Sequence, residues 1–121
     1  TSIALGRADF RDNCASCHGM TGKGDGPMRS SLVKPPADLT TIAQRNGGQF
    51  PQEQIGEVID GRWLGDAGPH GSREMPVWGQ VYRLRAGEHY ADTYYDAEAY
   101  VRIRVLAVVE YINRLQVSNR P

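Results

Sequence analysis

The chain has 121 residues, of which 40% are hydrophobic and 8% aromatic, and its fourteen basic side chains balance fourteen acidic ones. A chain of this length is predicted to form one domain, residues 1–121, with limited apolar surface for a core. The zero net charge gives no indication of a nucleic-acid partner and argues against recruitment by a basic field over the whole molecule. No run approaches the roughly 18 apolar residues of a membrane span.

Ser2 to Asn13 is predicted to form the first helix, and Ser2 can cap its start. Its apolar positions alternate with arginines and aspartates that suit a solvent-facing side. Gly6 lies inside this helix, where glycine costs about 1 kcal/mol relative to alanine. We therefore expect a close packing contact at Gly6.

Cys14-Ala15-Ser16-Cys17-His18 comes next and is the strongest motif in the chain. Two cysteines at this spacing lie on the same side of a helical turn. They can bond to the two vinyl groups of one haem while the imidazole reaches the iron, and C-x-x-C-H is typical of c-type haem attachment. The motif predicts thioether bonds at Cys14 and Cys17, with His18 as an axial ligand.

Other uses of the two cysteines fit the surrounding sequence less well. A thioredoxin-like site would lie beside a strand–helix–strand pattern, which these surroundings lack. A structural zinc site needs four ligands, and only His70 or His89 would add the fourth, at no recognisable spacing. A disulfide would close a very small loop and would leave His18 without a role.

Gly19 to Pro36 is predicted to be a loop, because glycine recurs through it. A Rossmann dinucleotide-binding loop would follow a strand and open a helix, whereas this one follows a helix and a cysteine motif. We expect it to wrap the proximal side of the haem. The second ring nitrogen of His18 needs an acceptor there, since neighbouring groups orient ligand imidazoles.

Two further helices are predicted in the middle of the chain. Asp38 or Thr40 is expected to cap a short helix over Thr41–Asn46. The other runs from about Pro51 to Asp60 and ends at Gly61. Its expected buried stripe consists of Ile55, Val58 and Ile59.

Residues 62–74 form a polar, glycine-rich stretch that leads to Met75, a candidate for the second axial ligand. The other two methionines lie close to His18 along the chain, on the proximal side. Met75 follows the middle helix, where the chain can have passed round to the distal side of the haem. The alternative ligands are His70 and His89.

Gln80 to Tyr95 is polar and is interpreted as an insert, either a partner surface or an elaborated loop. Ala97 to Gln116 carries the strongest helical pattern, since Asp96 can cap it and apolar residues recur at three- and four-residue spacing. The apolar stripe comprises Val101, Val105, Val108, Ile112 and Leu115.

The chain resembles the class I monohaem cytochromes c in its single C-x-x-C-H, its later Met75-Pro76 and its C-terminal amphipathic helix. The resemblance implies an all-α class I cytochrome c fold, with crossed N- and C-terminal helices around one covalently bound haem c. In that crossing Gly6 lets the C-terminal helix approach closely, beside the ring of Phe10. The expected partners of these two residues are Val108 and Tyr111.

The resemblance also implies particular contacts with the haem. On the proximal side, the carbonyl of Pro35 or Pro36 is expected to accept the hydrogen bond of the ligand imidazole, and Leu39 to lie against the ring. On the distal side, Met75 is the implied ligand, and Trp78 is expected to pack against its loop and the haem.

This resemblance implies an electron carrier rather than an enzyme, whose iron cycles between Fe(III) and Fe(II). The expected partners of this monomer are redox proteins: a donor dehydrogenase or membrane complex, and an acceptor oxidase or reductase. The alternatives are a haem subunit or domain of a periplasmic dehydrogenase or terminal oxidase, and a haem catalyst or gas sensor with a labile sixth ligand. Family members receive their haem outside the cytoplasm, so we expect an exported, periplasmic protein whose signal peptide has been removed. Its expected basic docking rim comprises Lys23, Arg29, Lys34 and Arg73.

Overall fold

The structure is a computed structural model, and it describes residues 2–33, 35–61, 78–89 and 97–117. Within these ranges every regular element is a helix or a helical turn, and no residue belongs to a strand. The predicted all-α class is therefore confirmed. In the same ranges no helix combines the length and the apolar character needed to cross a membrane.

The N-terminal segment is helical beyond its predicted end. Helix α1 (Ser2–Asp9), the π-helical turn η1 (Phe10–Cys14) and helix α2 (Ala15–His18) follow one another directly. The segment ends at Gly19, whose φ of 83° lies in the region that favours glycine. The whole cysteine motif thus lies on helical backbone, and π turns of this kind are frequent at functional sites.

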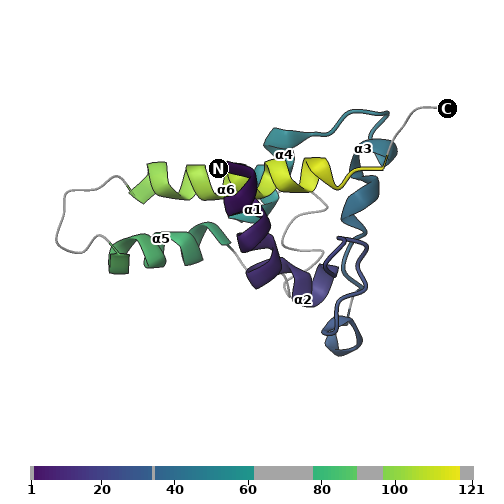
Figure 1. The fold of residues 1–121 in the computed structure, drawn as a ribbon, viewed down its shortest axis with the longest axis horizontal. Helices are drawn as coiled ribbons and strands as arrows, with labels where there is room; N and C mark the ends of the chain where they lie inside the picture. The colour runs from purple at the N-terminus through teal and green to yellow at the C-terminus, as the bar shows by residue number, and fades with distance from the viewer. Residues whose placement is uncertain (1, 34, 62–77, 90–96, 118–121) are drawn as a thin grey trace.

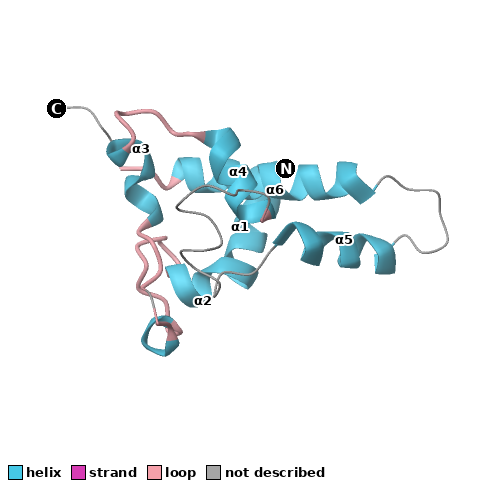
Figure 2. Ribbon diagram, turned by 180° about the vertical axis from the view of Figure 1, so that it is seen from behind, coloured by secondary structure: helices cyan, strands magenta, loops and turns pink. Residues whose placement is uncertain are grey.

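Helix α6 (Ala97–Arg114) crosses α1, as Figures 1 and 2 show. A Cβ atom at Gly6 would collide with the backbone carbonyl of Ala107, so only glycine permits this approach. One turn later, the rings of Phe10 and Tyr111 pack with their centroids 5.3 Å apart. The predicted crossing of the terminal helices is confirmed.

The interpretation of residues 80–95 as a polar insert is wrong for its first part, because Trp78–His89 forms helix α5. This helix lies antiparallel to the first half of α6 (Figure 1). Tyr82 and Ala86, one turn apart, are each only 1% exposed. The sequence pattern did not reveal this short buried stripe, because Arg83, Leu84 and Arg85 separate its two residues and Leu84 is exposed.

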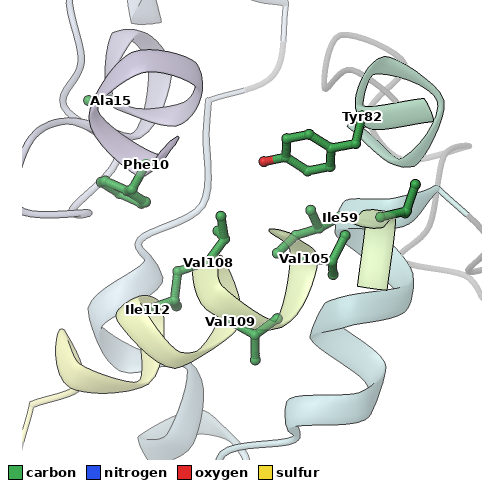
Figure 3. Packing of buried hydrophobic residues seen from close by; sticks show 9 residues of the cluster. Phe10, Ala15, Ile59, Tyr82, Val105, Val108, Val109 and Ile112 are labelled. Carbon is green, nitrogen blue, oxygen red and sulfur yellow. The ribbon is translucent and has the colours of Figure 1, made fainter. Parts of the chain in front are cut away.

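Helix α4 (Gln52–Asp60) packs against both α5 and α6 and ends at left-handed Gly61, as predicted. The core lies where these helices meet α1 (Figure 3). Its buried members are Phe10, Ala15, Ile59, Tyr82, Val101, Val105, Val108, Val109 and Ile112. The predicted stripe of α6 is therefore confirmed, with Leu115 half-buried at its end.

The chain between α2 and α4 contains little regular structure. A 3-10 turn, η2 (Arg29–Ser31), interrupts the predicted loop, and a second turn, η3 (Leu39–Thr41), leads into the short helix α3 (Ile42–Arg45). The Asp38 carboxylate accepts hydrogen bonds from the backbone N–H of Thr40 at 2.9 Å and from its hydroxyl at 2.6 Å. Asp38 is thus the cap of this helical segment.

Candidate functional site

Cys14 and Cys17 lie one turn apart at the end of the N-terminal helical segment, and both are half-buried free thiols. The structure therefore has no disulfide bond between Cys14 and Cys17. The described residues also bring together no group of three or more histidine, cysteine or acidic side chains suited to a metal ion. The motif side chains are thus not arranged around one point, as a zinc site would require.

Burial raises the pKa of the Cys14 thiol to about 12, and electrostatic interactions with the Asp9 carboxylate and with Cys17 add to the effect. Cys14 is therefore a protonated thiol at neutral pH. It packs against the hydrophobic core, together with the half-buried side chains of Leu39 and Trp78. Trp78 also lies beside Tyr82, with their ring centroids 6.5 Å apart.

His18 ends α2, and its Nδ1 lies 3.0 Å from the backbone carbonyl oxygen of Ala37. A carbonyl can only accept, so Nδ1 carries the proton and Nε2 presents its lone pair. Burial lowers the pKa of His18, and the hydrogen bond to Ala37 offsets part of that effect. Burial therefore favours the neutral imidazole, which is the form that binds a metal ion. The hydrogen bond to Ala37 fixes its tautomer.

The acceptor of the His18 hydrogen bond differs from the prediction, which named Pro35 or Pro36. Ala37, the next residue, supplies the carbonyl. The Pro36 carbonyl instead lies against Gly24, where a Cβ atom would be only 2.7 Å from its oxygen. The prolines therefore set the path of the chain, and the residue that follows them meets the imidazole.

The glycine-rich loop after His18 folds back onto the end of α2. Its backbone N–H groups donate to the final carbonyls of that helix, which would otherwise lack partners. The pairs are Gly24 to His18, Gly26 to Cys17 and Met28 to Ser16, at 2.7, 3.0 and 2.8 Å. A side chain at Gly26 would run into the carbonyls of α2, so glycine is needed for this approach.

The remaining predicted residues are only partly described. Met75, His70, Lys34 and Arg73 lie outside the described residues, and so does the side chain of His89. Lys23 and Arg29 of the predicted basic rim are both exposed. Met75 as the distal ligand therefore stays a prediction from the sequence.

Sequence reasoning missed a buried polar group beside the cysteine motif. The Asp9 carboxylate, 5% exposed, receives two hydrogen bonds from the Arg104 guanidinium, at 2.9 and 2.7 Å. The Tyr82 hydroxyl donates to the same carboxylate at 3.5 Å. Burial raises the pKa of Tyr82, and the negative charge of Asp9 adds to the rise. These contacts join α1, α5 and α6, and no local pattern connects residues so distant along the chain.

Comparison with known proteins gives one match. A family model described as Cytochrome c matches residues 3–99, a stretch that contains the whole C-x-x-C-H motif and extends beyond Met75. No curated protein and no solved structure matches the chain. The matched stretch covers well over half of the residues.

Proposed function

We propose a function from the premise that this chain belongs to the cytochrome c family. The family binds a covalent haem c and uses it for electron transfer, and the two cysteines of the C-x-x-C-H motif fit that cofactor. Within this family we propose a class I, monomeric, single-domain carrier that takes up and gives up one electron per encounter. The haem supplies the redox chemistry, since its iron alternates between Fe(III) and Fe(II).

The protein's proposed part in this chemistry begins with covalent attachment. Cys14 and Cys17 would each form a thioether with the haem, and their state as free thiols on one helical segment supports this role. His18 would bind the iron through Nε2. The observation that carries the proposal is its Nδ1–H bond to Ala37, because such a bond fixes the tautomer and the ring orientation of a ligand imidazole.

Met75 is proposed as the distal ligand, which would fill the sixth position and leave no room for a substrate. Its place in the sequence supports this role, because it follows the middle helix and lies within the stretch that matches the family. A His/Met ligand pair raises the reduction potential relative to harder ligands. Such a pair suits a carrier that accepts electrons from one protein and donates them to another.

The optical spectrum of the purified protein, oxidised and reduced, tests the proposal. We expect a c-type haem spectrum and a weak near-infrared band from the ferric iron–thioether bond. Met75→Ala should lose that band and should bind carbon monoxide in the reduced state. The matched control Met20→Ala, at a residue 61% exposed, should retain the band.

Two outcomes would contradict this proposal. A haem protein without the near-infrared band would move the distal position to a histidine or to an open site. Colourless protein, made in cells that attach haem, would overturn electron transfer altogether.

Redox proteins are the proposed partners: a dehydrogenase or membrane complex as donor, and an oxidase or reductase as acceptor. Encounters of this kind use small interfaces that release quickly. A periplasmic location is proposed from the expectation that family members acquire their haem after export. Cell fractionation of the organism that makes the protein would test it, and haem-loaded protein in the cytoplasmic fraction would contradict it.

A further inference from the structure

The chain just beyond the end of α6 is hydrogen-bonded to residues 37–43, the segment whose first carbonyl accepts the hydrogen bond from His18. The Gln116 side chain lies just beyond α6 and uses both ends of its amide. Its Oε1 accepts from the backbone N–H of Ala43 at 2.9 Å, and its Nε2 donates to the carbonyls of Leu39 and Ile112 at 2.5 and 2.9 Å. The backbone N–H of Val117 adds a bond to the Thr40 carbonyl at 2.8 Å.

Residues 37–43 therefore share two hydrogen bonds with the Gln116 side chain. The segment begins with Ala37, whose side chain is exposed and whose carbonyl accepts the hydrogen bond from His18. The Gln116 side chain donates a hydrogen bond to the Leu39 carbonyl and accepts one from the Ala43 N–H. On the opposite side, the Leu39 N–H donates to the Gly22 carbonyl at 2.6 Å. The carbonyl that orients His18 is thus only two residues from the point where Gln116 holds the chain.

We propose that Gln116 is a positioning residue for the proximal ligand. By fixing residues 37–43 it sets the strength of the hydrogen bond between Ala37 and His18, and through that bond the reduction potential of the haem. The inference rests on the proposed function in one respect, namely that His18 is an iron ligand.

The direction of the effect follows from the chemistry of the imidazole. A strong Nδ1–H bond to a carbonyl increases the negative character of the ring and makes it a better donor to the iron. Greater donation stabilises Fe(III) more than Fe(II), so it lowers the potential. Loss of the Gln116 contacts lets Ala37 move away from His18, and the potential then rises.

The amide of Gln116 suits this task better than other side chains of similar size. It offers one acceptor and two N–H donors, and its neighbours are one backbone N–H group and two carbonyls. Methionine has a similar length but makes none of these bonds. Glutamate keeps the acceptor for Ala43 and loses the donors for Leu39 and Ile112.

The experiment compares holoprotein variants Gln116→Met and Gln116→Glu with wild type. The control is Gln44→Met, at an exposed glutamine that directly follows residues 37–43. For each protein the midpoint potential is measured by redox titration, and solvent exchange of the His18 Nδ1–H is measured by NMR in the reduced state. Gln116→Met should show a raised potential. The added negative charge of Gln116→Glu favours Fe(III) and opposes such a rise, so this variant is judged by its exchange. Exchange in both Gln116 variants should be faster by up to about tenfold, the equilibrium equivalent of one net hydrogen bond. The control should match wild type.

The outcomes separate the inference from its premise. The inference alone would be overturned if haem-loaded Gln116→Met kept the wild-type potential and the wild-type exchange rate. Gln116 would then be a structural residue, even if the variant resisted urea less well. Where Gln116→Met fails to retain haem, the exchange of the His18 Nδ1–H in Gln116→Glu decides: exchange at the wild-type rate would overturn the inference. Wild-type protein without an iron–His18 bond would overturn the proposed function as well.

Discussion

The crossing of α1 with α5 and α6 and the loop that holds His18 are stabilised in different ways. At the crossing, Phe10, Tyr82 and Val108 are each 1% exposed, and buried apolar surface is the main source of stability. In the loop between Gly19 and Ala37 most side chains are exposed. That loop is held by backbone hydrogen bonds to α2, and its glycines allow the close approach that these bonds require.

This difference separates the stability of the fold from the environment of the proposed haem ligand. Burial acts without direction, so a core side chain contributes free energy of folding without fixing any single bond. Hydrogen bonds have a required geometry, so the loop can set the orientation of His18 while contributing little buried area. Variants at the crossing should therefore change unfolding, and variants in the loop should act on His18.

The largest effect is expected at the buried ion pair in the crossing. Asp9→Asn removes the negative charge that faces Arg104, whose side chain is only 22% exposed. Loss of one partner from a buried pair leaves the other charge uncompensated, and we expect a loss of about 2–3 kcal/mol of unfolding free energy. Urea unfolding of the holoprotein measures it.

The control for this prediction is Asp12→Asn. Asp12 pairs with Arg11 on the surface, where both side chains are more than half exposed (58% and 63%). Exposed pairs contribute about 0–1 kcal/mol, so this variant should unfold nearly as wild type does. Equal losses in the two variants would show that the buried pair is not special to the crossing.

A pair of helical glycines sharpens the comparison, because the same substitution should have opposite signs. Gly6→Ala places a methyl group against the Ala107 carbonyl and should destabilise the protein by about 1–3 kcal/mol. Gly56→Ala in α4 meets only the ordinary contacts of Val105 and Val109, at 3.7 and 3.8 Å. It should stabilise by about 0.5–1 kcal/mol, since alanine is the better helix former.

Thermal and urea unfolding of the two alanine variants measures these shifts. A destabilising Gly56→Ala would point to packing around α4 that is tighter than the structure has it. A neutral Gly6→Ala would mean that α1 and α6 can separate without loss, which the close crossing does not allow.

The features that could be predicted from sequence are those with local or strongly periodic signals. The cysteine motif, the stripe of α6 and the caps at Asp38 and Gly61 all depend on residues a few positions apart, so they could be read in order along the chain. The unusual Gly6 also gave a correct expectation of close packing, because a helical glycine has an intrinsic cost that needs a cause.

The features that were missed depend on contacts between distant residues. Helix α5 has only a short buried stripe at Tyr82 and Ala86, and its arginines find partners elsewhere in the fold. The pairing of Asp9 with Arg104 follows from the helix crossing and has no trace in the local pattern. The proline prediction failed by one residue, because the turn geometry that decides which carbonyl meets His18 is not encoded in residue type alone.

A smaller loss than at the helix crossing is expected at Asp38, next to the residue whose carbonyl accepts the His18 hydrogen bond. Its hydrogen bond from the Thr40 side chain is the main cause of a lowered pKa for the Asp38 carboxyl, with smaller contributions from the Thr40 N–H and nearby cations. Because the pKa of Asp38 is lower in the folded state, its ionised carboxylate stabilises the fold at pH values above the unfolded-state pKa of about 3.9. That contribution is lost as the pH falls through the folded pKa.

Asp38→Ala should therefore cost about 1 kcal/mol at pH 7, the usual value of a helix N-cap, and the cost should shrink as the pH falls below about 3.9. Asp38→Asn retains a capping side chain without a titrating group, so its difference from Asp38→Ala should stay constant with pH. Urea unfolding of the three holoproteins between pH 7 and pH 3 tests both statements. If Asp38→Ala cost the same free energy of unfolding at low pH, the hydrogen-bond geometry of the cap alone would be stabilising. The charge of Asp38 would then make no contribution to the stability of residues 37–43.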